Sequence, residues 1–205
     1  MRMLKVAAVA AALTLPFAGG AAGELNVPSG TYVMDPTHTS VTWKVDHLGL
    51  SKYTARFTEF TGEITLNAED PTKSKVVATI NPLSLRTDYP NAEVKDFDKE
   101  LQSGTNWFDA GQFPQITFTS TKITETSPTT GTIEGELSLL GVTKPVTLDV
   151  VLNGALPKHP FVDAAALGFS ATGSLKRSDF GMTHLIPNVG DEVQILIETE
   201  FVEAK

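Results

Sequence analysis

The fold of this chain is decided by residues 131–152, whose sequence reads GTIEGELSLLGVTKPVTLDVVL. Apolar or small side chains alternate with polar ones along two runs, at Ile133, Gly135, Leu137 and Leu139 and again at Val146, Leu148, Val150 and Leu152. An alternation with a period of two buries one face of a strand and leaves the other in water, which is typical of antiparallel sheets. The stretch therefore predicts two strands of such a sheet.

The same alternation continues on both sides of this stretch. Further runs, separated by Gly, Pro, Asn and Asp, occupy residues 41–45, 76–80, 116–119, 169–175 and 193–197. About eight such strands in one domain form a sandwich or a closed barrel, and closure removes exposed strand edges. We therefore expect an all-β domain with no break inside residues 31–203.

One predicted strand changes its phase. The segment Tyr53–Leu66 is long for a strand, and its apolar positions fall on one parity at Ala55 and Phe57 but on the other from Phe60 onward. A bulge absorbs one residue and bends a strand, as strongly curved barrels require. We expect this bulge near Thr58-Glu59.

Another segment interrupts the β rhythm altogether. Residues Asn91–Gln102 carry Val94, Phe97 and Leu101 at three-and-four spacing. This spacing predicts one amphipathic helix of about three turns, which Gly104 ends. We expect this helix to pack near an open end of the β structure.

The first 23 residues have the organisation of a secretory signal. A basic head, Met1–Lys5, precedes an apolar run, Val6–Phe17, and small residues follow that run. We expect cleavage near Ala22 or Gly23, export to the periplasm, and one mature domain over residues 24–205. The alternative interpretation is a buried N-terminal helix. Because the chain has no Cys, it has neither disulfides nor a lipid-modified N-terminal cysteine.

The charge balance excludes one class of partner. The whole chain has a net charge of −8, and residues 24–205 carry 14 Lys and Arg against 24 Asp and Glu, a net charge of −10. Such an acidic domain releases no counterions on nucleic acid and is repelled by anionic lipid surfaces. We therefore expect no nucleic-acid partner.

Motifs for catalysis or metal binding are missing. The four His residues show neither HxH nor HExxH spacing, so only tertiary clustering could build a metal site. Residues 168–172 lack the last Gly of a G-x-S-x-G elbow, and there is no P-loop or dinucleotide fingerprint. The sequence therefore predicts no catalytic residue, no metal and no cofactor.

The inward-facing positions combine large rings with small residues. An eight-stranded barrel is just wide enough to hold either packed side chains or one small ligand. Large rings alone could simply fill a core, but small residues in the wall leave room and favour a cavity. We expect its ligand-binding residues to include Trp43, Phe57, Phe60, Trp107, Phe118, Phe169, Ala171, Leu175 and Phe180.

Two polar residues share the parity of the buried positions. His47 is in phase with the run at 41–45, and Arg177 is in phase with the run at 169–175. A guanidinium in an apolar tube is costly unless it meets an anion. One interpretation makes both residues head-group contacts of an amphiphilic ligand. The alternative is that Arg177 pairs with Asp179 or Asp96 and that His47 is a satisfied strand-end histidine.

A series of motifs along the chain gives a family resemblance. They are Tyr32-Val33-Met34-Asp35-Pro36-Thr37-His38, His47-Leu48-Gly49, Asp98-Lys99-Glu100-Leu101, Trp107-Phe108-Asp109-Ala110, Phe113-Pro114-Gln115-Ile116-Thr117-Phe118, Gly141-Val142-Thr143-Lys144-Pro145-Val146 and Arg177-Ser178-Asp179-Phe180-Gly181. From about Thr31 to Glu200 the chain resembles the YceI-like family of exported bacterial proteins that bind polyisoprenoid lipids. The resemblance implies an antiparallel up-and-down lipocalin-like β-barrel of about eight strands, a bound isoprenoid as ligand and no catalytic residues.

This sequence departs from the family pattern at several positions. Thr39, Trp43 and Ala55 stand where Ser, Phe and Gly are commoner. Lys95-Asp96 replaces a common Arg-Asp pair, which puts a family head-group contact from that segment in doubt.

Three functions follow as hypotheses. The first is a periplasmic carrier of an isoprenoid of the quinone or prenyl phosphate type, which contacts a donor or acceptor membrane transiently. The second is an envelope-stress or partner-binding module with a filled barrel. The third is an enzyme acting on an isoprenoid, for which the sequence offers no acid–base groups. A second copy of the chain remains open as a partner.

Overall fold

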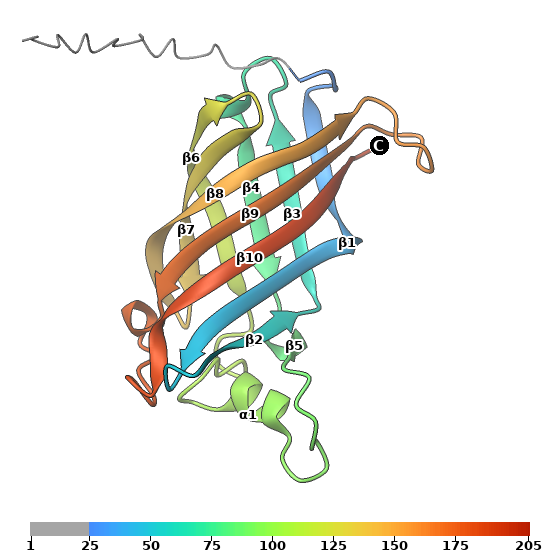
Figure 1. Ribbon diagram of the computed structural model, residues 1–205. Coiled ribbons are helices and arrows are strands. Elements are labelled where there is room, and N and C mark those ends of the chain that lie inside the picture. Colours follow the sequence, from blue (N-terminus) through green and yellow to red (C-terminus); the bar gives the residue numbers. More distant parts are fainter. Residues whose placement is uncertain (1–24) are drawn as a thin grey trace, which may run out of the picture.

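The computed structural model describes residues 25–205 and shows eight strands closed into an antiparallel barrel (Figure 1). The predicted signal sequence, 1–23, lies outside the described residues. The barrel strands are β1 (Gly30–His47), β3 (Phe60–Leu66), β4 (Lys75–Ile80), β6 (Ile116–Ser127), β7 (Thr130–Leu139), β8 (Val142–Leu156), β9 (Ala166–Lys176) and β10 (Val189–Glu203). Closure comes from pairing between the first and last strands, so the predicted lipocalin-like, all-β barrel is confirmed.

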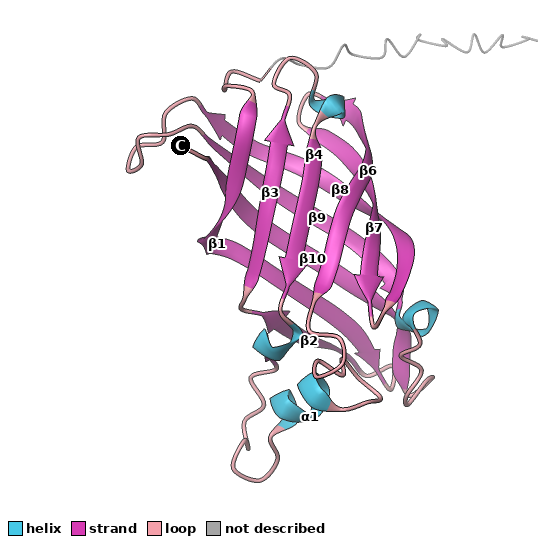
Figure 2. Ribbon diagram, turned by 180° about the vertical axis from the view of Figure 1, so that it is seen from behind, coloured by secondary structure: helices cyan, strands magenta, loops and turns pink. Residues whose placement is uncertain are grey.

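The remaining elements gather at one end of the barrel. They are β2 (Ser51–Phe57), the short 3-10 turn η2 (Pro82–Ser84), β5 (Leu85–Arg86), α1 (Phe97–Ser103) and η3 (Arg177–Phe180), while η1 (Pro71–Lys73) precedes β4. Figure 2 shows α1 below the barrel, across the end where β2 lies. None of the helices within residues 25–205 has the length and apolar character needed to cross a bilayer.

The stretch that predicted the sheet forms β7 and β8. These strands pair antiparallel, with Ile133 opposite Leu148 and Gly135 opposite Val146. Val146 and Leu148 are buried, as their parity predicted. Gly135 has a packing role, because a Cβ there would lie 2.3 Å from the Phe118 ring of the neighbouring strand. The absent side chain lets that ring turn inward over β7.

The predicted phase change separates two strands. β2 ends at Phe57 and β3 begins at Phe60, so Thr58-Glu59 interrupts the long segment. β1 pairs with β2 along its second half and with β3 along its first half. Phe57 and Ile64 are both buried although they have opposite parity, as expected across an irregularity.

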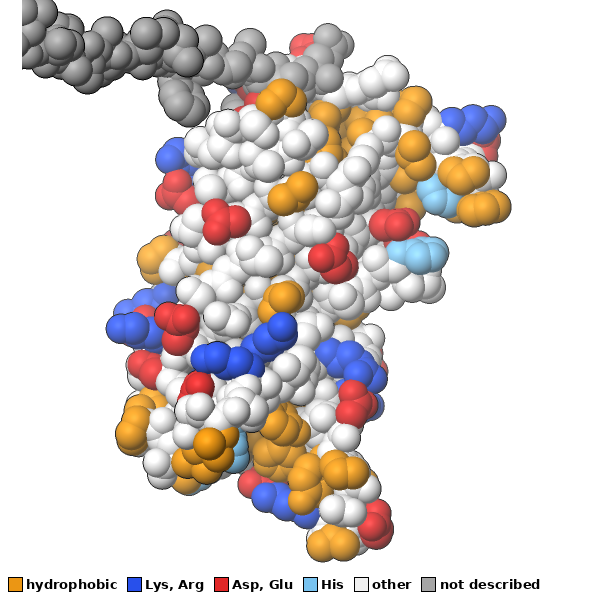
Figure 3. Space-filling view, in the orientation of Figure 1, with side chains coloured by type: hydrophobic (Ala, Val, Ile, Leu, Met, Phe, Trp, Pro, Cys, Tyr) orange, Lys and Arg blue, Asp and Glu red, His pale blue; other side chains and the backbone are white. Residues whose placement is uncertain are grey.

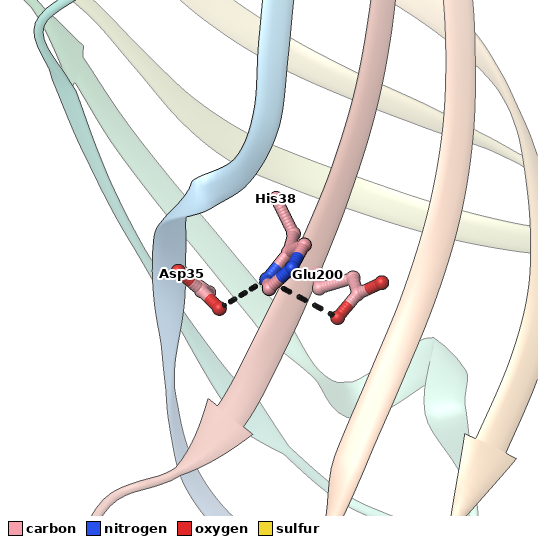
Figure 4. Close-up of side chains that lie close together, drawn as sticks. All are labelled: Asp35, His38 and Glu200. Carbon is pink, nitrogen blue, oxygen red and sulfur yellow. Dashed lines mark hydrogen bonds and ion pairs between the residues drawn. The ribbon is translucent and has the colours of Figure 1, made fainter. Parts of the chain in front are cut away.

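β1 bends opposite this break. Its register against β10 shifts between Asp35 and Ser40. The Asp35 carboxylate accepts hydrogen bonds from the Thr37 N–H (2.8 Å) and hydroxyl (2.6 Å), and its other oxygen lies 2.7 Å from His38 Nδ1. Glu200 on β10 lies 3.9 Å from the same nitrogen (Figure 4). These contacts hold the bend together.

These contacts shift the pKa values of Asp35 and His38. Hydrogen bonds from Thr37, followed by the His38 contact, lower the pKa of Asp35 from 3.8 to about 2. The hydrogen bond to Asp35 and the charges of Asp35 and Glu200 raise the pKa of His38 above its ordinary value of 6.5. The folded state thus favours a charged carboxylate and a charged imidazole.

The helix is shorter than predicted. It begins at Phe97 because the Asp96 side chain caps it, accepting from the Lys99 N–H at 3.0 Å. The predicted start at Asn91 is wrong, since the Asn91 carbonyl instead accepts two N–H groups in a separate turn. Val94 lies in that turn and is 82% exposed, so it is no part of an amphipathic face. Gly104 ends the helix as predicted.

α1 closes its end of the barrel rather than lying beside an opening. Leu101 of α1 is buried in one cluster with Phe57, Leu85 and Phe180. The Phe108 ring, after the helix, packs edge-on against Phe57 with centroids 5.5 Å apart. We call this apolar packing between α1 and the barrel the plug.

Arg177 anchors a loop beside the plug. Its guanidinium donates hydrogen bonds to the carbonyls of Gly190 (2.8 Å), Met182 (3.0 Å) and Val189 (2.9 Å). Within residues 25–205 it makes no ion pair with Asp179 or Asp96, the partners considered from the sequence.

The surroundings of Arg177 also affect its pKa. Burial lowers the pKa of Arg177, and nearby Asp191 opposes that shift. Burial would raise the pKa of Asp191, but two hydrogen bonds from Ser178 and the charges of Arg177 and Lys176 together keep that pKa below its ordinary value. A charged guanidinium therefore crosslinks η3 to the start of β10.

The bend in β1 predicts a pH dependence of stability. Asp35 has a lowered pKa, so its contribution is present above pH ~4 and is lost as the pH falls toward 2. His38 has a raised pKa, so its contribution is complete below pH ~6.5 and is lost as the pH rises through its folded-state pKa. We expect the melting-temperature difference between wild type and Asp35→Asn to be largest between pH ~4 and ~6.5. A difference that stays constant across pH would contradict this account.

The carbonyl contacts of Arg177 predict a structural loss. Arg177→Gln removes the charge and leaves carbonyls without the donors that three guanidinium N–H groups now provide. The free energy of unfolding, measured in urea, should therefore fall by about 3 kcal/mol. Arg56→Gln is the matched control, because Arg56 pairs with Asp88 on the exposed surface and should cost less than about 1 kcal/mol. Unchanged stability with altered lipid preference in Arg177→Gln would instead support a head-group role.

Candidate functional site

A cavity of about 250 Å³ occupies the barrel between the plug and the opposite end. Every barrel strand contributes to its wall. β8 supplies Val146, Leu148, Val150 and Leu152, and β10 supplies Ile195, Ile197, Thr199 and Phe201. These residues lie at every second position because alternate side chains of a barrel strand point inward. The predicted parity thus gives an apolar interior.

Four predicted ligand-binding residues line this cavity: Phe60, Phe118, Phe169 and Ala171. They come from three strands: Phe60 from β3, Phe118 from β6, and both Phe169 and Ala171 from β9. Ala171 is buried and lies opposite Val150 of β8 and Ile197 of β10, which also line the cavity. Its small side chain leaves space between these two apolar neighbours.

The other predicted apolar residues lie nearer the α1 end of the barrel. Phe57 and Phe180 are buried in the plug, and Trp43, Trp107 and Leu175 pack against it. They were expected in the cavity wall, but the structure places them outside it. Parity identified the inward face correctly, yet it carries no information on height along the barrel axis.

Trp43 has a further property. Its Nε1 is buried, and no hydrogen-bond acceptor reaches it among the described residues. The ring lies 6.5 Å from Phe108 in the plug, one inward position along β1 from the cavity residue Val41. The Trp43 N–H group therefore lies near the end of the cavity that faces the plug.

The two predicted polar contacts also lie away from the cavity wall. His47 ends β1 and is exposed to solvent rather than turned inward. Arg177 is buried, but its guanidinium is engaged by the three backbone carbonyls of the loop that it anchors. Neither residue is brought to the cavity by the fold.

The polar part of the cavity was not found by sequence reasoning. It lies at the β6–β7 hairpin, where Glu125 and a group of hydroxyl side chains line the wall: Thr124, Ser127, Thr129, Thr130 and Thr132. We call this region the polar rim. The hydroxyl-rich sequence at residues 124–132 was its available signal. Solvated hairpin residues share that composition, and Ser127, Thr129 and Thr130 are exposed at the hairpin tip. Only the tertiary structure shows that this hairpin borders the cavity.

Glu125 has an unusual position for a carboxylate. Burial, followed by the charge of Asp70, raises the pKa of Glu125 above its ordinary value. Among the described residues that line the cavity, it is the one ionisable side chain, and no Lys, Arg or His accompanies it. The wall therefore holds no acid–base pair, and its chemistry is suited to binding an apolar molecule with an uncharged polar end.

One further cluster contains metal-ligating side chains. The ligand atoms of Asp35, His38 and Glu200 lie within 4.8 Å of one another at the bend of β1, away from the cavity wall. Sequence spacing could not show this group, because only barrel closure brings Glu200 to the first strand. The short contact between His38 and Asp35 accounts for the cluster as a hydrogen-bonded bend.

Comparison with known sequences places this chain among related proteins. A family model described as the YceI-like domain matches residues 32–201. A UPF0312 protein of Yersinia enterocolitica is 35% identical over 168 residues, which cover 82% of this chain and 83% of that protein. Protein YceI of Salmonella arizonae is 36% identical over 168 residues with the same coverage.

Solved structures share the fold. BcnA of Burkholderia cenocepacia superposes with a TM-score of 0.69 at 22% identity, over 82% of this chain and 98% of that one. The YCEI protein of Campylobacter jejuni gives 0.65 at 27% identity, over 79% and 91%. A domain of Saccharophagus degradans described as polyisoprenoid-binding gives 0.59 at 12% identity, over 84% and 98%. Because the family model and these relatives span most of its length, this chain belongs to the YceI-like family.

Proposed function

We propose that this protein is an exported carrier that holds a long isoprenoid lipid, with the tail in the barrel cavity and the head at the polar rim. The observation that carries the proposal is the apolar cavity lined by all eight barrel strands, with hydroxyl groups gathered at one end. Membership of the YceI-like family supports it. The polyisoprenoid-binding description of the Saccharophagus degradans domain agrees with it.

The tail and the head group of the lipid contribute differently to the binding free energy. Burial of each CH₂ contributes about 0.8 kcal/mol, so a few isoprene units already supply most of the affinity that a non-covalent complex expresses. Tail length is then a weak selector that depends on cavity depth. Selection between lipid classes must come from the head group.

The polar rim favours an uncharged head, such as a quinone, over a prenyl phosphate. A phosphate beside Glu125 would meet a carboxylate and no cation among the described wall residues. Burying such a charge without a partner is costly. Quinone oxygens, by contrast, can accept hydrogen bonds from threonine and serine hydroxyls. Binding without catalysis is the simplest use of this wall, because its titratable side chain stands alone.

The proposed place of action is supported by the first 23 residues. Their basic head, apolar run and small-residue end support export through a cleaved signal, and hence a periplasmic location. A water-exposed compartment between membranes is where a carrier that shields an isoprenoid tail is useful. The mature chain would begin close to Glu24.

Native mass spectrometry of protein purified from its own periplasm tests this function. We expect a co-purifying long-chain isoprenoid of the quinone type. After extraction with organic solvent, the protein should bind a long-chain ubiquinone at least about tenfold more tightly than a prenyl phosphate of similar tail length, because one uncompensated charge costs more than about 1.4 kcal/mol. Absence of bound lipid together with no quinone uptake would refute the carrier function, and preference for the phosphate would refute the head-group assignment.

Substitution of a small wall residue tests the location of the tail. Ala171→Trp fills space between Val150 and Ile197, so quinone uptake should fall at least about tenfold while the melting curve remains cooperative. Thr172→Trp is the control, because the neighbouring residue of β9 is exposed. Normal uptake by a folded Ala171→Trp protein would place the tail elsewhere.

A further inference from the structure

The loop between β8 and β9 presents an aromatic ring to solvent. Phe161 is 91% exposed, the largest exposed fraction among the large apolar side chains of residues 25–205. Val162 in the same loop and Leu156 at its base are also exposed. Exposure of such a ring in water is unfavourable, and neighbouring apolar side chains at one tip indicate an interaction site.

The loop holds this ring in a defined position. His159 Nδ1 accepts hydrogen bonds from the N–H groups of Phe161 and Val162, both at 3.2 Å. The His159 N–H donates to the Ala164 carbonyl at 2.8 Å, and the imidazole packs edge-on against the Phe161 ring. Pro160 further restricts the backbone. Binding through Phe161 therefore costs little additional ordering of the loop.

The loop lies at the same end of the barrel as the polar rim. It joins β8 and β9 beyond Leu152 and Phe169, which line the cavity. Figure 1 shows it projecting from the end opposite α1, and Figure 3 shows hydrophobic and basic side chains together on this projection. The plug fills the other end. On the side of the loop a second buried cluster, which includes Leu167 and Phe201, fills part of the barrel, and the cavity borders the β6–β7 hairpin beside it, so we place lipid exchange there.

The charged side chains around the tip of the β8–β9 loop are compatible with a shallow contact with lipid headgroups. Lys158 and Lys205 both approach Asp163, at 3.4 Å and 3.8 Å, and all three side chains are largely exposed. Lysine beside an exposed aromatic ring is typical of segments at a membrane interface. The acidic barrel opposes binding to strongly anionic lipids, so the contact suits a zwitterionic surface.

We propose that the β8–β9 loop docks this protein on a lipid bilayer by inserting Phe161 into the interface, which turns the polar rim toward the membrane. The proposal rests on the carrier function and adds the surface through which cargo is exchanged. One inserted ring gives a weak and reversible contact. Reversibility is what a carrier needs, because it must leave the donor membrane after loading.

Flotation with phosphatidylcholine vesicles tests the docking directly. We expect wild type to partition to the vesicles and Phe161→Ser to partition about tenfold less, because the ring supplies most of the buried apolar area. Leu50→Ser is the matched control: Leu50 is 83% exposed, but it lies in the β1–β2 turn at the plugged end. Both substitutions are on the surface, so folding is preserved.

Quinone uptake separates docking from cargo binding. Phe161→Ser should take up a long-chain ubiquinone from the same vesicles about tenfold more slowly than wild type, yet equally well from ethanol solution. No flotation of wild type, equal flotation of Phe161→Ser and wild type, or a loss in Leu50→Ser would overturn the docking proposal. No uptake from ethanol by wild type would overturn the carrier function, and flotation would still decide the docking.

Discussion

Hydrogen bonds between β1 and β10 close the barrel, and neither the cavity nor the packing at the α1 end would form without this closure. These strands stand at opposite ends of the chain, and their hydrogen bonds turn an eight-stranded sheet into a closed wall. To close it, β1 must pair with β10 on one side and with both β2 and β3 on the other. The bend held by Asp35, Thr37 and His38 adjusts the register between these partners.

The closed wall encloses two different interiors. Toward α1, large rings such as Phe57 and Phe108 interlock and fill the barrel. Toward the β6–β7 hairpin, aliphatic side chains and the small Ala171 surround a cavity that ends at Glu125 and threonine hydroxyls. The end near α1 is filled throughout, whereas the opposite end combines a smaller buried cluster around Tyr32 and Leu167 with the cavity, and the Phe161 loop projects from this end.

Much of the fold was predictable because strand periodicity is a local property. The runs at 133–139 and 146–152 became β7 and β8 with the expected face buried, and the phase change appeared at Thr58-Glu59. The helix was predicted too long, since the Asp96 cap overrode an apolar spacing that included exposed Val94. Of the candidate site, Phe60, Phe118, Phe169 and Ala171 line the cavity, whereas the other candidates lie below or outside it.

The all-β class, the inward face of most strands and the family could be identified from the sequence, because alternation and ordered motifs are properties of neighbouring residues. The position of each inward side chain along the barrel axis depends on the folded structure, because strand tilt and register follow from closure. The folded structure also placed the Arg177 guanidinium on backbone carbonyls and brought Glu125 to the cavity wall, where burial raises its pKa. Both depend on segments distant in sequence that meet only when the barrel closes.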